Sequence, residues 1–194
     1  ADVEQAIELL ERATTIDPRF AAAYVARAEA AIFVAEYDVT DDREERFENA
    51  LEQGRGLVER ALALAPDNGD AYLARASMTA YEDLAAAEAD YRRGLELSPN
   101  SAKGYNGLAV VLYETPARRD EALAMLDRAR KLDPLQPAYD VTRAIFLLYE
   151  RADVRGANDL LTDVLRRHPG YLTRAFARPL PPCGRGGRRQ SSRN

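Results

Sequence analysis

A proline that recurs about every 34 residues constrains this chain more than any other feature of its sequence. Four prolines are spaced at 33, 35 and 35 residues: Pro66, Pro99, Pro134 and Pro169. Pro18 precedes the first of them by 48 residues, which is one period plus about 14. Proline lacks an N–H and clashes inside a continuing helix, so each one marks a turn. A fixed period of this length indicates an array of small units that bury their apolar faces on one another.

Small or apolar residues occupy fixed places ahead of each proline. Twelve residues before it stand Ala6, Gly54, Ala87, Ala122 and Ala157. Five residues before it stand Ala13, Ala61, Gly94, Ala129 and Val164. These columns share one face of a helix, and small side chains let two helices cross closely. The segment before each proline is therefore predicted to be a helix that packs against a neighbour.

A second apolar block follows each proline. Its copies read AAAYVARAEAAIF from Ala21, DAYLARASMTAY from Asp70, KGYNGLAVVLY from Lys103 and AYDVTRAIFLLY from Ala138, and a fifth copy, GYLTRAFA, starts at Gly170 and breaks off. Each block has helical periodicity, and no segment alternates with the period of two that a strand requires. The unit is thus helix, turn, helix and proline turn. Asp120 and Asp153 are the predicted N-caps of two second helices.

The unit resembles the tetratricopeptide repeat. The resemblance rests on the period, the small-residue columns, the closing proline and an early aromatic at Tyr24, Tyr72 and Tyr105, with Tyr139 one place early. It covers about residues 2–177 and implies an all-α solenoid of antiparallel helix pairs with about four repeats. Arginine stands where the family usually has leucine in three copies, at Arg27, Arg75 and Arg143, while Leu108 keeps it. We expect these arginines to bury their aliphatic stems.

The extra residues of the first interval form an insertion at about 37–49, reading YDVTDDREERFEN from Tyr37. Thr40 or Asp41 suits a helix N-cap, and the acids that follow favour a helix N-terminus. A second helix lengthened at its start, from about Asp41 to Leu64, is therefore expected. This extension is either a docking surface or a solvated charged segment.

The two ends differ in composition from the repeats. The chain begins with a second helix that lacks its first, so its apolar stripe leaves room for self-association. Residues 178–194 have no apolar periodicity and are predicted to be a disordered basic tail. The tail is interpreted as a contact for nucleic acid or acidic surfaces, as an out-of-frame or artificial ending, or as an inert terminus.

Catalytic and metal-binding patterns are not recognisable. His168 is the one histidine and Cys183 the one cysteine, and neither has the partners that a metal site or a nucleophile requires. No cofactor, no metal and no enzymatic activity are expected, and no apolar run is long enough for a membrane span. The unpaired cysteine favours a reducing, cytoplasmic location, with the periplasm as the alternative if the parent protein is membrane-bound. Nucleic acid is not an expected partner except through the basic tail.

The tetratricopeptide resemblance implies a protein or peptide partner, held in the concave groove that the first helices line. The groove positions carried over to this chain are Val25, Glu29, Ile32, Phe33, Leu73, Ser77, Tyr81, Asn106, Val110, Tyr113, Val141, Ile145 and Tyr149. Family members that clamp a C-terminal carboxylate use several basic groove residues, whereas here only Lys103 qualifies. The predicted ligand is instead an apolar or amphipathic segment, although many of these residues are equally suited to packing between helices.

A narrower resemblance gives a second hypothesis. One repeat, an insertion and then regular repeats is an order similar to the tetratricopeptide segment of certain bacterial signalling proteins. There the segment follows a nucleotide cyclase or a winged-helix DNA-binding domain. The alternative function is therefore a sensory or regulatory segment of such a larger protein.

Overall fold

The computed structural model describes residues 2–36, 42–151, 153–169 and 171, and these residues form helices joined by short turns. The helices are α1 (Asp2–Ile16), α2 (Ala21–Glu36), α3 (Arg43–Leu64), α4 (Gly69–Thr79), α5 (Leu84–Leu97), α6 (Ala102–Tyr113), the 3₁₀ turn η1 (Pro116–Arg118), α7 (Arg119–Leu132), α8 (Pro137–Arg151) and α9 (Val154–Arg167). No strand occurs within these described ranges. The predicted all-α architecture is confirmed.

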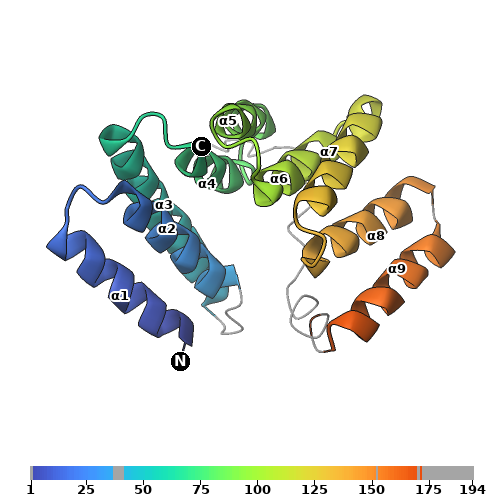
Figure 1. Ribbon diagram of the computed structural model, residues 1–194, viewed down its shortest axis with the longest axis horizontal. Coiled ribbons are helices and arrows are strands. Elements are labelled where there is room, and N and C mark those ends of the chain that lie inside the picture. Colours follow the sequence, from blue (N-terminus) through green and yellow to red (C-terminus); the bar gives the residue numbers. More distant parts are fainter. Residues whose placement is uncertain (1, 37–41, 152, 170, 172–194) are drawn as a thin grey trace, which may run out of the picture.

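Helices adjacent in sequence pack on one another and build an arch (Figure 1). The first helices of the units are α2, α4, α6 and α8, and each pairs with the second helix that follows it, α3, α5, α7 or α9. The helix α1 is a further second helix and packs on α2. In Figure 1, α4 and α6 lie beneath α5 and α7, toward the inside of the arch. The predicted solenoid of antiparallel helix pairs is therefore the observed fold.

The small-residue columns lie at the helix crossings. Ala61, Ala87, Ala122 and Ala129 are fully buried. At Gly94 of α5, an added Cβ would lie 2.6 Å from Leu73 Cδ2 of α4 and 3.0 Å from a backbone oxygen. Since real Cβ atoms essentially never approach other atoms to within 3.0 Å, this crossing requires glycine.

The helix starts use side-chain caps at several places. Asp153 Oδ1 accepts a hydrogen bond from the Gly156 N–H at 2.9 Å, which confirms the predicted N-cap of α9. The prediction for Asp120 is wrong, because α7 begins one residue earlier and is preceded by η1. Pro116 starts that 3₁₀ turn and carries the chain directly into α7. Asp120 therefore lies in the first turn of the helix, where a carboxylate still favours the helix dipole.

The helix α3 is longer than the other second helices, with 22 residues against 14 in α5, α7 and α9. This confirms a second helix lengthened at its start, although Thr40 and Asp41 lie outside the described residues. The N-cap position is Asp42, whose side chain makes no capping hydrogen bond. Phe47 of the extension makes an edge-to-face contact with Tyr81 at 5.2 Å between ring centroids. The extension is thus packed on the turn after α4.

Three arginines of the first helices each bind an acid sixteen residues earlier, on the preceding second helix. The ion pairs are Arg27–Glu11 at 3.1 Å, Arg75–Glu59 at 3.1 Å and Arg143–Asp127 at 2.7 Å. Their side chains are only 23%, 30% and 29% exposed, as expected for buried stems. The guanidinium groups also connect one unit to the next, a role that the sequence reading missed.

Candidate functional site

A small cavity lies between α2, α4, α5 and α6. It has a volume of about 170 Å³ and is lined by Glu29, Leu73, Ser77, Tyr91, Lys103 and Gly104. Five of these residues come from three successive first helices, α2, α4 and α6, and Tyr91 comes from α5. The sequence placed Glu29, Leu73 and Ser77 in one groove, and the structure brings these three together.

The predicted groove residues divide by exposure into three groups. The exposed group contains Phe33, Ser77, Tyr81, Val110 and Tyr149. The half-buried group contains Glu29, Ile32, Asn106, Val141 and Ile145. The buried group contains Val25, Leu73 and Tyr113. The first two groups have surface that a partner could contact, and the third does not.

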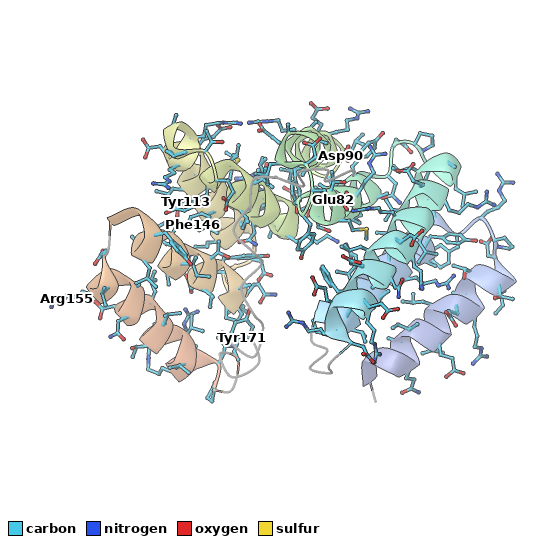
Figure 2. All side chains as sticks on the ribbon, turned by 180° about the vertical axis from the view of Figure 1, so that it is seen from behind. Glu82, Asp90, Tyr113, Phe146, Arg155 and Tyr171 are labelled. Carbon is cyan, nitrogen blue, oxygen red and sulfur yellow. The ribbon has the colours of Figure 1, made fainter. Side chains whose placement is uncertain are left out.

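Tyr113 belongs to the core and is not an accessible groove residue. Its ring stacks on Phe146 of α8 with centroids 3.7 Å apart, and its hydroxyl donates a hydrogen bond to the Phe146 carbonyl at 2.7 Å (Figure 2). The Arg119 guanidinium carbon lies 4.9 Å from the centre of the same ring. Tyr113 is 6% exposed, so it joins α6 to α8 and corrects the expectation of a tyrosine facing the ligand.

Val25 and Leu73 are likewise packed between helices. Leu73 is 3% exposed, and its methyl groups fill the space above Gly94 and Gly104. Val25 is 4% exposed and lies in the apolar cluster that α2, α3 and α4 share. Both side chains are therefore helix-packing residues, and the glycines at positions 94 and 104 leave room for Leu73.

Ion pairs of one lysine connect three first helices. Lys103 Nζ of α6 lies 2.7 Å from Glu29 Oε1 of α2 and 4.0 Å from Asp70 Oδ1 of α4. The three side chains are 51%, 42% and 57% exposed, so solvent and a ligand can reach them. The sequence identified Lys103 as the groove-side lysine, but it did not predict a partner 74 residues away.

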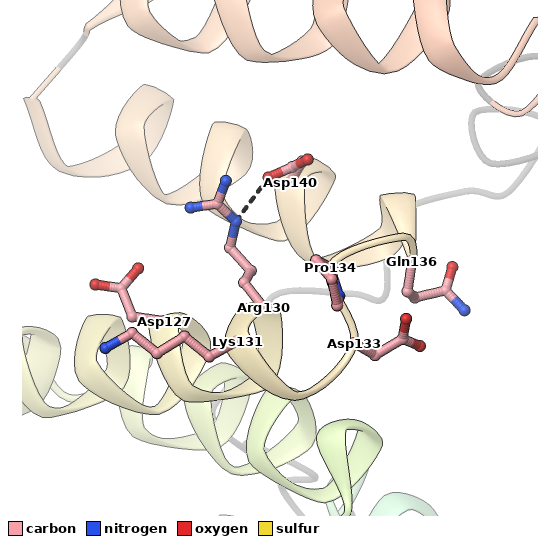
Figure 3. A pocket seen from close by; sticks show the side chains of 7 residues that line it. All are labelled: Asp127, Arg130, Lys131, Asp133, Pro134, Gln136 and Asp140. Atoms are coloured by element: carbon pink, nitrogen blue, oxygen red, sulfur yellow. Dashed lines mark ion pairs between the residues drawn. The ribbon is translucent and has the colours of Figure 1, made fainter.

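A second cavity of about 410 Å³ lies at the turn between α7 and α8 (Figure 3). Asp140 of α8 lines it, and this buried carboxylate lies 2.8 Å from Arg130 Nε of α7 and 2.6 Å from Arg167 Nη2 of α9. A buried carboxylate is costly unless it is paired, and here two guanidinium groups from neighbouring helices neutralise it. We interpret this cluster as a structural link that holds α7, α8 and α9 together.

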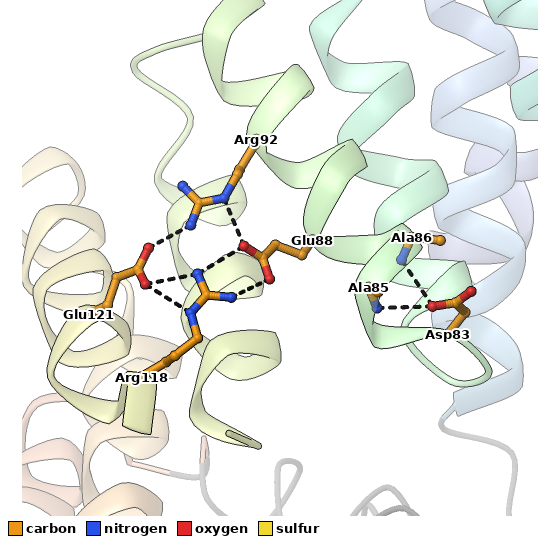
Figure 4. Close-up of polar contacts among 7 residues, drawn as sticks. All are labelled: Asp83, Ala85, Ala86, Glu88, Arg92, Arg118 and Glu121. Atoms are coloured by element: carbon orange, nitrogen blue, oxygen red, sulfur yellow. Dashed lines mark hydrogen bonds and ion pairs between the residues drawn. The ribbon is translucent and has the colours of Figure 1, made fainter. Parts of the chain in front are cut away.

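Another ion cluster connects α5, η1 and α7 (Figure 4). Arg118 binds Glu88 at 2.5 Å and Glu121 at 2.8 Å, and Arg92 binds the same two glutamates at 2.8 Å and 2.5 Å. The hydrogen bonds from Arg118 and then Arg92 lower the pKa of Glu88, and those from Arg92 and then Arg118 lower the pKa of Glu121. Each arginine pairs with both glutamates. Because Arg118 lies in the turn between α6 and α7, these ion pairs hold that turn against α5 and α7.

Within the described part of the chain, no group of three or more His, Cys, Asp or Glu side chains is arranged to hold a metal ion. His168 is the C-cap residue of α9, and Cys183 lies outside the described residues. None of the described helices combines the length and the apolar character of a membrane span. The predicted basic tail, 178–194, also lies outside the described residues.

Comparisons with known proteins support the fold. The structure is similar to the crystal structure of YrrB, described as a TPR protein with an unusual peptide-binding site, with a TM-score of 0.55 and 18% identity over 91% of this chain and 83% of that one. It is also similar to the crystal structure of MamA, with a TM-score of 0.55 and 14% identity over 86% of this chain and 88% of that one. The fold is therefore that of tetratricopeptide repeat proteins.

Sequence comparison gives a shorter match. The chain is 37% identical over 83 residues to cellulose synthase operon protein C of Xanthomonas axonopodis pv. citri (strain 306). The match covers 43% of this chain and 5% of that protein's length. No protein-family model matches the sequence.

Proposed function

We propose that this chain, which has the tetratricopeptide fold, is a protein-interaction module that holds a peptide or protein segment in its concave groove. The observation that carries the proposal is the set of exposed apolar and aromatic side chains on three of the first helices. Phe33 of α2, Val110 of α6 and Tyr149 of α8 are 46%, 40% and 58% exposed. Burying such side chains against a partner is favourable, and aromatic residues are enriched where proteins bind one another.

The groove surface differs from the packed surface beneath it. The proposed contact residues are Glu29, Ile32, Phe33, Ser77, Tyr81, Asn106, Val110, Val141, Ile145 and Tyr149. Val25, Leu73 and Tyr113 have the helix-packing role described above. The peptide-binding site in the description of YrrB agrees with this type of function.

The alternative, a regulatory segment of a nucleotide cyclase or DNA-binding regulator, receives no support from the comparisons reported above. A scaffold role without catalysis fits the described side chains better. It requires no acid–base pair, and the ion pairs of the two clusters join neighbouring helices.

Selection from a library of peptides displayed on phage tests the proposal. The wild-type chain is the bait, and each enriched peptide is then tested on a Val110→Asp/Tyr149→Asp variant whose fold is checked by circular dichroism. We expect enriched peptides with apolar or aromatic residues that bind the wild type and not this variant. An Ala89→Asp/Ala124→Asp variant is the control, because both alanines are exposed on second helices. Peptides whose binding is weakened more by this control than by the groove variant would contradict the proposal.

A further inference from the structure

The charged groups of the groove are unequal in number. Glu29, which lines the cavity, and Asp70 of α4 both lie within 4.0 Å of a single ammonium group, that of Lys103. Lys103 is the one basic residue that lines this cavity. The local balance is therefore one negative charge in excess.

We propose, on the basis of the proposed function, that the groove selects a partner peptide that carries a lysine or arginine next to an apolar side chain. The peptide's cation binds Glu29 and Asp70 in place of Lys103, which swings into solvent. Lys103 thus occupies the cation site of the free protein.

The exchange keeps every carboxylate paired. When a ligand cation replaces the Lys103 ammonium, Glu29 retains an ion pair and the exposed lysine side chain becomes solvated. A ligand carboxylate would instead be attracted by one ammonium group and repelled by two carboxylates. Local electrostatics therefore favour a cationic ligand.

The wider charge distribution acts in the same direction. Residues 170–194 hold 6 of the 27 basic residues and none of the 32 acidic ones, so residues 1–169 carry 21 basic and 32 acidic side chains, a net charge of −11. Many of the described arginines are engaged with acids of the same chain, as in the clusters around Arg118 and Arg130. An acidic body attracts a cationic peptide and speeds its encounter, most strongly at low salt.

The surroundings of the ion pair provide space for one apolar side chain. Ser77 and Gly104 line the same cavity, and their small size leaves its volume of about 170 Å³ open above Leu73. Further along the groove, Val110 is 40% exposed. The site therefore suits an extended segment with a cation and an apolar side chain, rather than a folded domain.

Two matched synthetic peptides test the inference. They share the same leucine, phenylalanine and tyrosine residues and differ only in carrying two lysines or two glutamates, and fluorescence anisotropy gives their affinities. The wild type is compared with Glu29→Gln, Lys103→Met and the control Lys131→Met, which changes the chain's other lysine outside the groove. Thermal unfolding of each variant is measured in parallel.

We expect the lysine peptide to bind the wild type more tightly than the glutamate peptide. Glu29→Gln should weaken the lysine peptide about tenfold, the scale of one hydrogen bond to a charged group. Lys103→Met should strengthen it, because the internal competitor is gone, and Lys131→Met should leave it unchanged. A purely structural ion pair would instead lower the unfolding temperature of both groove variants without altering the preference between the peptides.

Several outcomes overturn the inference. A tighter glutamate peptide, or a lysine peptide weakened by Lys103→Met, shows that Lys103 itself is the binding group. If both peptides bind the wild type with equal affinity and neither binds the Val110→Asp/Tyr149→Asp variant, the groove binds peptides without charge selection. That result contradicts the inference and supports the proposed function. If neither peptide binds, the inference and the proposed function fail together. Glu29-dependent binding of a synthetic peptide of residues 178–194, which is rich in arginine, would by contrast support the selection of cations.

Discussion

At the scale of single residues, one close helix crossing depends on the absence of one methyl group. Gly94 lies at the crossing of α4 and α5, where the buried Leu73 side chain and a backbone oxygen occupy the space that a Cβ would need. Leu73 is also packed closely against α6, where a Cβ at Gly104 would lie 2.9 Å from the Leu73 Cδ2 atom. The sequence indicated this by the recurrence of small residues in the same column.

Gly94→Ala is expected to lower the free energy of unfolding by about 1–3 kcal/mol, because the added methyl group overpacks the crossing. Gly56→Ala is the control, since a Cβ there meets nothing within 4 Å on the exposed side of α3. The control should raise the free energy of unfolding by about 0.5–1 kcal/mol through helix propensity. Urea denaturation followed by circular dichroism measures both, and a Gly94→Ala chain as stable as the wild type would contradict the packing described here.

Other residue roles could not be predicted from the repeat pattern. Tyr81, Tyr113 and Tyr149 share one column, yet they are 38%, 6% and 58% exposed. Tyr113 is buried because Phe146 of the next first helix stacks on its ring. Which side chain lies opposite depends on the twist between units, and a column of one sequence does not contain that information.

At the scale of helices, ion pairs join each unit to the one before it. Arg75 of α4 binds Glu59 of α3 at 3.1 Å and Asp90 of α5 at 2.7 Å. The acid sixteen residues before the arginine is visible in the sequence in three copies. In the copy that has Leu108, the corresponding residue is Arg92, which binds other acids. The acid is thus present in the copies that have the arginine and absent from the copy that has leucine. This correlation in the sequence could have predicted the ion pairs.

Arg75→Met is expected to lower the free energy of unfolding by about 1–2 kcal/mol, because Asp90 is only 17% exposed and loses its main partner. Arg155→Met, at an exposed position of α9, should have almost no effect. A double-mutant cycle with Asp90→Asn separates the pair from other effects of the substitution. The interpretation fails if Arg75→Met has the same cost in the Asp90→Asn background as in the wild type.

At the scale of the whole molecule, the period, the small-residue columns and the prolines were sufficient to predict the all-α solenoid. The arch and its contacts between non-adjacent units were not predictable. The ion pair between Lys103 and Glu29 spans 74 residues and depends on the way in which successive first helices turn toward one another. The buried Asp140 cluster likewise requires three helices to meet at one point.

The ion cluster around Arg118 predicts how stability depends on pH. The pKa values of Glu88 and Glu121 lie below their ordinary value of about 4.5 in the folded chain, because both arginines stabilise the ionised carboxylates. Their contribution to stability is therefore complete above about pH 4.5 and is lost as the pH falls through the lowered pKa values.

Arg118→Met should destabilise the chain at pH 7, and the difference from the wild type should shrink and disappear as both glutamates become protonated. Arg60→Met, at an exposed position of α3, is the control and should show no such pH-dependent difference. Denaturant unfolding at a series of pH values measures this effect. A difference between Arg118→Met and the wild type that stays constant into acid would show that the glutamates are not coupled to Arg118.

The most direct test of the groove is site-specific photo-crosslinking with a peptide obtained from the library selection. A photoreactive phenylalanine analogue is placed at the exposed Val110 of α6, a proposed groove residue, or at the exposed Ala89 of α5. Binding in the groove predicts a crosslink from position 110 that excess unlabelled peptide abolishes, and none from position 89. A crosslink from position 89 alone would contradict it and assign binding to the outer surface of the arch.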